Sequence, residues 1–202
     1  MALAQGTDLL EFRMDTVGPS TSREIEANLS EFSGRAIFAV RPVVEGGRFM
    51  GNESERLALI RELSELRPAY FDIELRTLEA NPKLVSEKLG KEIIVSWHDT
   101  VRTPRRADLS SIKARATSYE GLVKVVATAN NATDNLTILS LYDEPGPRPI
   151  AFCMGTPGLF SRVMAIEYGS PIAYASLPGE PTATGQLSLS KVIAIRRRLL
   201  GG

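Results

Sequence analysis

Short apolar runs with the character of β-strands alternate along the chain with segments of helical periodicity. Within Glu55–Leu66 apolar residues recur every three positions, which predicts an amphipathic helix, and Asn52 with Glu55 forms a capping-box pattern at its start. A similar pattern predicts a helix over Gln186–Leu200. The runs that predict strands are Asp8–Met14, Ala36–Arg41, Tyr70–Leu75, Glu92–Trp97, Gly121–Ala127, Pro149–Met154 and Ile172–Ser176.

The order of these elements indicates an α/β fold. Weaker helical patterns lie between the strand-like runs, at residues 20–33, 79–90, 105–118, 130–142 and 158–167. Strand and helix therefore alternate seven times, which is typical of a parallel sheet. Neither a low-complexity linker nor a change in composition interrupts the sequence, so a single domain over residues 1–202 is expected.

The charges within the strands help to distinguish two α/β architectures, an open doubly wound sheet and a (βα)8 barrel. Strands of an open parallel sheet are covered on both faces and tend to be continuously apolar. Here Glu11, Arg13 and Asp15 share one face of the first strand. Asp72 and Glu74 share one face of the third. No Gly-x-Gly-x-x-Gly motif follows a strand. The pattern favours a (βα)8 TIM barrel with a charged mouth, of which seven βα units are legible.

The composition limits the functions to be considered. The 24 Lys and Arg residues balance the 24 Asp and Glu residues, so the totals indicate neither a nucleic-acid-binding protein nor an acidic tail. The single cysteine, Cys153, excludes an internal disulfide, and together with one histidine it does not make a zinc site. The start lacks a signal-peptide pattern, and no run of about 18 apolar residues occurs. We expect a cytoplasmic protein with no metal, nucleic-acid or membrane partner.

Lys124 is the most informative of the charged residues predicted at the carboxyl ends of the strands, where barrel active sites form. It lies within Gly121–Ala127, among leucine and valine residues. Burial disfavours the charged form of a lysine, and the neutral amine suits a Schiff base with a carbonyl substrate. The alternative is a lysine that extends to solvent or pairs with a carboxylate.

His98 is the only histidine, and it directly follows the apolar strand Glu92–Trp97. A histidine pKa near 6.5 allows the imidazole to take and return a proton at neutral pH. Beside Lys124 it could move the protons that imine formation and hydrolysis require, and Glu45 is a candidate to orient it. The alternative is a strand-end histidine that is satisfied by a hydrogen bond.

Three arginines and one loop are candidates for ligand binding. The guanidinium groups of Arg13, Arg41 and Arg162 match the geometry of a carboxylate, although a surface ion pair is the commoner role of a single arginine. The polar loop 178–186 contains Thr182 and Gln186, which are candidates to close over a hydroxylated ligand. An ordinary surface loop is the alternative.

Eight segments occur in a fixed order across nearly the whole chain. They are DLLEFRMD (8–15), RPVVEGG (41–47), DIEL (72–75), SWHD (96–99), VKV (123–125), MGTPGLFSR (154–162), YGS (168–170) and GQ (185–186). With these segments in this order the chain resembles type I 3-dehydroquinate dehydratase, the Schiff-base class of the enzyme. A single segment is weak evidence, but the ordered set is highly specific.

The resemblance implies a (βα)8 barrel that converts 3-dehydroquinate to 3-dehydroshikimate in the shikimate pathway of aromatic amino acid biosynthesis, with neither a cofactor nor a metal. By position, Lys124 is the Schiff-base lysine, His98 the general acid/base and Glu45 its supporting carboxylate. The implied substrate-binding residues are Glu11, Arg13, Arg41, Arg162, Thr182 and Gln186, with Met154 and Tyr174 as apolar lining. The resemblance also implies a homodimer.

The chain departs from the family pattern in places. The family loop Ser-Ala-Pro-Gly-Gln is Thr-Ala-Thr-Gly-Gln here, at 182–186, and Gly121 stands where an aspartate is common. The early strand at Leu9 matches the second of eight, so we expect the first strand and most of the first helix to be missing. Two other functions suit a strand lysine: another Schiff-base barrel enzyme such as a class I aldolase, and a non-catalytic barrel that binds sugar acids.

Overall fold

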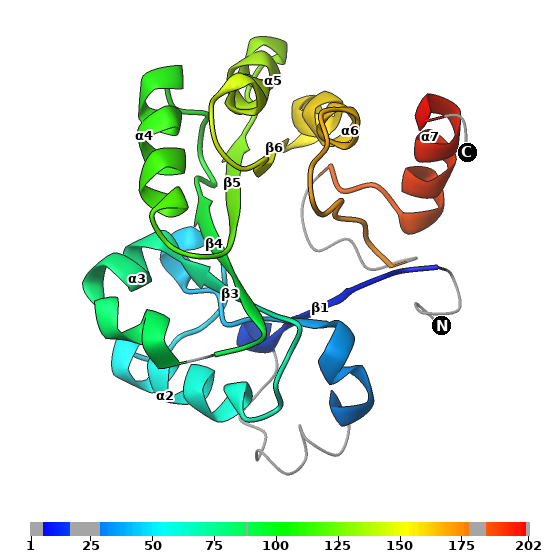
Figure 1. Ribbon diagram of the computed structural model, residues 1–202. Helices are drawn as coiled ribbons and strands as arrows, with labels where there is room; N and C mark the ends of the chain where they lie inside the picture. Colours follow the sequence, from blue (N-terminus) through cyan, green and yellow to red (C-terminus); the bar gives the residue numbers. More distant parts are fainter. Residues whose placement is uncertain (1–5, 17–28, 88, 178–184, 201–202) are drawn as a thin grey trace. The chain divides into compact units, whose positions relative to one another are not determined.

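The structure, a computed structural model, describes residues 6–16, 29–87, 89–177 and 185–200. The chain divides into two compact units. The N-terminal unit comprises Asp8–Ser96 together with Tyr119–Gly121, and the C-terminal unit comprises Trp97–Ser118 and Leu122–Gly202 with Met1–Thr7. Both units consist of parallel strands and flanking helices (Figure 1), which confirms the α/β class that the sequence predicts.

Four strands follow one another in chain order in the sheet of the N-terminal unit. They are β1 (Leu10–Arg13), β2 (Ala36–Ala39), β3 (Tyr70–Glu74) and β4 (Glu92–His98), and each neighbouring pair is parallel. In the register of this sheet Ala39 lies level with Asp72, and Glu74 lies level with Ser96. The carboxyl ends of β2, β3 and β4 therefore meet at one edge. The last two residues of β4 belong to the C-terminal unit.

The main helix of the N-terminal unit begins at its predicted cap. The Asn52 side chain accepts a hydrogen bond from the Glu55 N–H at 3.0 Å, and the Glu55 carboxylate accepts one from the Asn52 N–H at 2.8 Å. These two bonds form the capping box and confirm the prediction for α2 (Glu53–Ser64). The other helical segments are α3 (Leu75–Ala80) and the 3-10 turns η2 (Met14–Thr16), η3 (Ser30–Arg35), η4 (Val43–Glu45) and η5 (Pro82–Glu87).

The C-terminal unit contains the parallel pair β5 (Leu122–Thr128) and β6 (Ile150–Met154). Lys124 lies level with Ile150, and Val126 lies level with Phe152. The middle of β5 is buried throughout, as expected of an almost continuously apolar strand. The helices, green to red in Figure 1, are α4 (Arg106–Thr117), α5 (Ala132–Leu139), α6 (Leu159–Glu167) and α7 (Leu189–Leu200), with the 3-10 turns η6 (Ser140–Asp143) and η7 (Thr156–Gly158).

Six of the seven predicted strands are confirmed, and the seventh, Ile172–Ser176, is wrong. Ser176 makes an isolated bridge to Ser188, donating its N–H to the Leu187 carbonyl and accepting from the Leu189 N–H. A strand needs a continuous partner, and here the partner segment turns into α7 directly after the bridge. Alternating apolar residues alone do not make a strand at this position.

The predicted helices are confirmed with two corrections. The segments 105–118, 130–142 and 158–167 contain α4, α5 and α6. The segment 79–90 is instead the end of α3 followed by η5, because Pro82 has no N–H and cannot continue an α-helix. Of the segment 20–33, residues 20–28 lie outside the described residues, and a 3-10 helix begins at Ser30.

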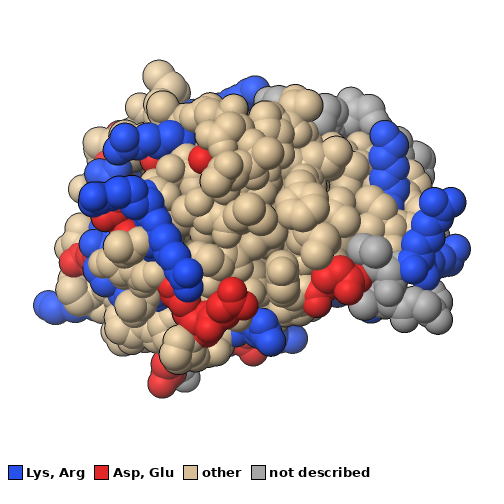
Figure 2. All heavy atoms as spheres, turned by 90° about the horizontal axis from the view of Figure 1, so that it is seen from above, with Lys and Arg blue, Asp and Glu red and all other residues tan. Residues whose placement is uncertain are grey.

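Charged residues at the surface are distinct from those buried at the strand ends. On the face shown in Figure 2, Lys, Arg, Asp and Glu side chains lie around the margins, and uncharged residues occupy the middle. Within the described ranges, no helix is both long enough and apolar enough to cross a membrane.

Candidate active site

Arg41 lies two residues beyond β2, at the edge where the strands of the N-terminal unit end. Its side chain is buried, with the residue only 3% exposed. Its Nη1 donates to Glu74 Oε1 and to Ser96 Oγ, both at 2.7 Å, and its Nη2 lies 2.7 Å from Asp72 Oδ1. The sheet register explains this convergence, because it brings the charged face of β3 beside the end of β2.

The environment of Arg41 fixes both its charge and its orientation. Burial alone would lower the pKa of the guanidinium, but the charges of Asp72 and Glu74, followed by that of Glu11, hold the pKa of Arg41 above its usual value. Two carboxylates from β3 and one hydroxyl from β4 contact its Nη1 and Nη2 atoms. The predicted anion-binding arginine is therefore a rigid, permanently charged group.

Asp15 connects the end of β1 to the loop that follows β2. Arg13 donates to both Asp15 carboxylate oxygens, at 2.9 and 2.7 Å, and the Arg48 N–H donates to Asp15 Oδ2 at 2.9 Å. Burial opposes ionisation of Asp15, but the hydrogen bond and charge of Arg13 outweigh it and hold the pKa of the Asp15 carboxyl below its usual value. Glu11 contributes to the raised pKa values of both Arg13 and Arg41, so these three predicted residues share one electrostatic environment.

The loop after β2 folds back over Arg41 because it contains two adjacent glycines. Gly46 adopts a left-handed conformation, with φ of 80°, and a Cβ on Gly47 would lie 1.9 Å from the Arg41 carbonyl oxygen. The Phe49 N–H then donates to that carbonyl at 3.3 Å. Glu45 lies in the η4 turn of this loop and is 6% exposed. The Gly-Gly pair thus holds Glu45 and Arg41 within one compact turn.

Lys124 is buried on β5 beside an aromatic pair. The residue is 4% exposed, and its Nζ lies 4.1 Å from the centroid of the Tyr174 ring. The Tyr174 and Phe152 rings lie 6.1 Å apart, and the Arg162 guanidinium carbon lies 4.3 Å from the centroid of Phe152. Lys124 therefore lies over the Tyr174 ring, and Arg162 lies over the Phe152 ring. The face of an aromatic ring attracts a cation at such distances.

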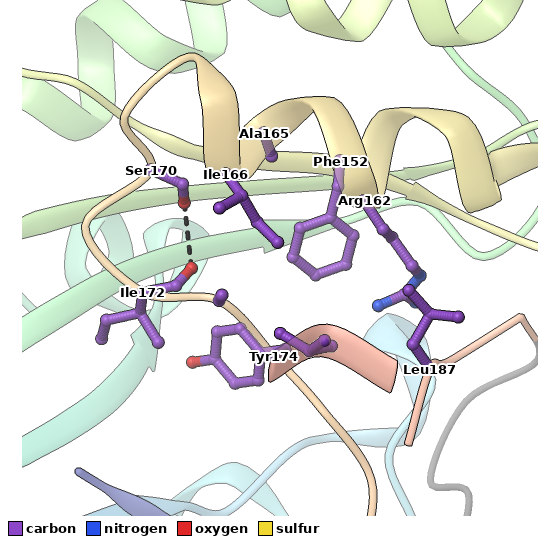
Figure 3. A pocket seen from close by; sticks show the side chains of 10 residues that line it. Phe152, Arg162, Ala165, Ile166, Ser170, Ile172, Tyr174 and Leu187 are labelled. Carbon is purple, nitrogen blue, oxygen red and sulfur yellow. Dashed lines mark hydrogen bonds between the residues drawn. The ribbon is translucent and has the colours of Figure 1, made fainter. Parts of the chain in front are cut away.

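Arg162 extends from α6 along a mostly apolar pocket of the C-terminal unit (Figure 3). It is 8% exposed, and among the described residues its Nε has no hydrogen-bond partner. Burial lowers the pKa of Arg162 to about 10, and Cys153 opposes this shift only in part. Buried cations are normally paired, so this arrangement suits the binding of an anionic ligand group.

His98 ends β4 on the same face as Lys124. The Asp99 N–H donates to the Val126 carbonyl at 2.9 Å, and in a parallel pair this bond places His98 level with Val126. Side chains on one strand alternate between faces, so Lys124 and Val126 point to the same side, as does the level His98. The His98 imidazole and the Lys124 amine therefore lie on the same face of the strands, and His98 is level with the residue two positions after Lys124.

The two residues predicted in the closing loop have different outcomes. Thr182 lies outside the described residues. Gln186 follows Gly185, which has φ of 79° and packs so closely on the β6–α6 turn that a Cβ would lie 2.4 Å from the Gly155 carbonyl oxygen. Glycine at this position lets the end of the loop rest against the segment that leads to Arg162.

The structure brings the predicted residues together in two groups, one per unit. Glu11, Arg13, Arg41 and Glu45 belong to the N-terminal unit, and His98, Lys124, Arg162 and Gln186 belong to the C-terminal unit. Among the described residues, no cluster of three His, Cys, Asp or Glu side chains is suited to hold a metal ion.

Sequence reasoning missed several residues that hold these groups in place. Asp15 lies on the predicted charged face with Glu11 and Arg13, but the pattern alone did not identify it as a site residue. Arg56 also gave a signal, because it occupies the buried stripe of α2 with Ile60 and Leu63 at spacings of four and three residues. Ser96 and Phe152 gave none, because their roles depend on partners that are distant in the sequence.

Gly121 explains one departure from the family pattern. It has φ of 155°, and a Cβ at this position would lie 2.5 Å from the Ile93 carbonyl oxygen. Any larger residue, including the aspartate that is common in the resembled family, would require the backbone to shift. Glycine is therefore a packing requirement of this chain.

Parallel βα units with a buried lysine on one strand are typical of α/β enzymes that form a Schiff base. The family model for type I 3-dehydroquinase matches residues 1–198, and the chain belongs to this family. This confirms the resemblance found in the sequence.

Curated relatives and solved structures agree with this membership. The chain is 33% identical over 194 residues to the 3-dehydroquinate dehydratase of Methanocaldococcus jannaschii, covering 94% of this chain and 86% of the relative. It is 38% identical over 190 residues to that of Pyrobaculum aerophilum, covering 93% of this chain and 62% of the relative. The crystal structure of the Aquifex aeolicus 3-dehydroquinate dehydratase superimposes with a TM-score of 0.82 at 28% identity, covering 98% of this chain and 90% of the other. The fold is thus of the TIM-barrel type.

Proposed function

We propose that this chain is a 3-dehydroquinate dehydratase, a carbon–oxygen hydro-lyase that forms 3-dehydroshikimate in the shikimate pathway of aromatic amino acid biosynthesis. The observation that carries the proposal is the buried Lys124, whose Nζ lies 4.1 Å from the Tyr174 ring. A lysine amine in a partly apolar site is suited to attack a ketone. The family membership supplies the substrate class.

In the proposed reaction, Lys124 replaces the ketone oxygen of the substrate with an iminium nitrogen and releases water. The iminium withdraws electrons, so the adjacent carbon can lose a proton and the electron pair moves toward nitrogen as an enamine. The enamine then expels the hydroxyl two carbons from the original carbonyl. Hydrolysis of the product iminium returns the lysine amine, so no redox change and no cofactor are required.

His98 is proposed as the group that moves the protons. Its position on the face of Lys124 suits removal of the proton beside the iminium and return of a proton to the departing hydroxyl. Both transfers occur in sequence, so one imidazole can serve as base and then as acid. Glu45, buried in the glycine-rich turn, is proposed to orient this imidazole.

The arginines are proposed to hold the substrate on its polar sides. Arg162, buried without a carboxylate partner among the described residues, fits the substrate carboxylate. Arg41, Arg13 and Glu11 fit hydroxyl groups, and Thr182 with Gln186 would close over the ligand. Met154 and Tyr174 would supply apolar contacts.

The remaining expectations are part of the same proposal. Residues 1–202 are proposed to act as one barrel domain of a cytoplasmic enzyme. The partner is a small molecule, and the chain is proposed to form a homodimer. Neither a nucleic acid nor a membrane takes part.

The product formed from 3-dehydroquinate tests this function. The proposal predicts a conjugated enone with unchanged carbon count, which is followed by its ultraviolet absorbance, and no enone with Lys124→Met. Two carbonyl fragments would instead indicate an aldolase. Binding without turnover, retained in Lys124→Met, would indicate a non-catalytic sugar-acid-binding barrel. Either result would contradict the proposal.

A further inference from the structure

Arg56 on α2 is a buried arginine of the N-terminal unit, and all three nitrogens of its guanidinium group are hydrogen-bonded. The residue is 1% exposed. Its Nε and Nη2 donate to the Glu53 carboxylate at 2.8 Å, and Nη2 also donates to Thr77 Oγ1. Its Nη1 donates to Glu74 Oε2 at 2.7 Å and to the Val40 carbonyl at 2.8 Å. Such a set of bonds uses the planar guanidinium fork fully.

Two of these contacts lead directly to Arg41. Glu74 shares its carboxylate, because Oε1 accepts from Arg41 and Oε2 accepts from Arg56. Val40 is the residue that precedes Arg41, so Arg56 also holds the backbone from which Arg41 projects. The charges alternate in sign along one line of ion pairs, which runs from the buried Asp72 through Arg41, Glu74 and Arg56 to the exposed Glu53.

We propose that Arg56 is a positioning residue that sets the orientation of Arg41 toward the substrate, through Glu74 and the Val40 carbonyl. This inference rests on the proposed function, in which Arg41 binds a substrate hydroxyl.

The physical reason is the balance of charge around Glu74. Without Arg56, the fully buried Glu74 carboxylate would have Arg41 as its one cationic partner among the described residues, and Arg41 also pairs with Asp72. Both the side chain and the backbone of Arg41 would then be free to shift. A shift of about 1 Å in a binding group can lower catalytic efficiency by about 100-fold.

Arg56→Lys is the sharpest variant, because it keeps the positive charge and loses the fork. One ammonium cannot span Glu53, Glu74 and the Val40 carbonyl together. We expect kcat/KM for 3-dehydroquinate to fall by about 10- to 100-fold, mainly through a higher KM, with kcat changed by less than about threefold. Arg61→Lys is the matched control, since Arg61 is on the same helix and pairs with Glu87 at the surface. It should match the wild type.

A double-mutant cycle distinguishes positioning from a merely structural role. If Arg56 acts through Arg41, then Arg56→Lys should have little further effect on kcat/KM in an Arg41→Lys background. An equal loss in both backgrounds, or an unchanged KM in the folded Arg56→Lys protein, would overturn the proposal. Arg56→Met is a second variant, and where it folds its KM and kcat are compared with those of the wild type in the same way.

The proposed function has its own separate readout. A wild-type protein that forms no enone would overturn the function, and this inference with it. A wild-type protein that turns over normally, beside an Arg56→Lys variant with an unchanged KM, would overturn this inference alone.

Discussion

Arg41 and Arg162 are both buried arginines, but they differ in the partners that surround their guanidinium groups. In the N-terminal unit, Arg41 contacts two carboxylates and a serine hydroxyl within 2.7 Å. In the C-terminal unit, Arg162 lies over the Phe152 ring, and its Nε has no partner among the described residues. Burial opposes the charge of both arginines, and the pKa is raised only where carboxylates compensate.

The difference indicates that the two arginines have different roles. A guanidinium that is paired with protein carboxylates is held in one orientation and contributes a fixed charge. A guanidinium that is buried without an anion costs stability until a ligand supplies one. Arg41 is therefore expected to act as a fixed charge, and Arg162 to bind an anionic group of a ligand.

Removing the carboxylate that Arg41 and Arg56 share should have the largest effect. Glu74→Gln leaves both Arg41 and Arg56 with less compensating charge in a buried place. We expect the free energy of unfolding to fall by about 3–5 kcal/mol, as for other broken buried ion pairs, when measured by urea titration. Glu87→Gln, in the surface pair with Arg61, is the control and should show no such loss. Equal effects of the two variants would contradict the account.

Arg162→Met should separate stability from function. Because no carboxylate among the described residues loses a partner, the free energy of unfolding should stay the same or rise. The KM for 3-dehydroquinate should rise by on the order of 100-fold, since a charged contact to the substrate is lost. The two quantities are measured by urea unfolding and steady-state kinetics. A clearly destabilised variant with a normal KM would show that Arg162 is a structural residue.

Lys113 provides an intermediate case of a buried cation. Its Nζ donates to the backbone carbonyls of Leu141, Glu144 and Pro145, at 3.0 to 3.3 Å. Lys113→Met should lower the free energy of unfolding by about 1–3 kcal/mol, because these carbonyls lose their donor. The KM should not change, since this group lies outside the candidate site. A raised KM with unchanged stability would contradict this assignment.

The smallest expected effect is the contribution of Asp15 to the pH dependence of the free energy of unfolding. Its pKa is held below that of the unfolded chain, so its contribution is complete above the unfolded value of about 3.9 and is lost as the pH falls through the folded pKa. The difference in free energy of unfolding between wild type and Asp15→Asn should therefore be constant above about pH 5 and shrink in acid. A difference that grows in acid would contradict the sign.

Much of the fold could be predicted from local sequence patterns, and the rest depends on partners that are distant in the sequence. Asn52 with Glu55 predicted the start of α2 correctly because a capping box involves only four neighbouring residues. Ile172–Ser176 was misassigned because a strand also needs a ladder, and that depends on Ser188 and the start of α7.

The site shows the same division between local and distant information. Sequence alone selected Arg41 and Arg162 as equivalent anion-binding candidates. Their different environments arise from Glu74 and Ser96, 33 and 55 residues from Arg41, and from the apolar surroundings of Arg162. Such contacts appear only when the strands are placed in register.

Reduction with borohydride in the presence of 3-dehydroquinate tests the central claim, which is that Lys124 forms an imine with the substrate. Borohydride converts an imine into a stable secondary amine, and peptide mass spectrometry then identifies the modified residue. The account predicts one substrate- or product-derived adduct, located on Lys124 and absent from Lys124→Met. Turnover without an adduct, or an adduct on another lysine, would contradict it.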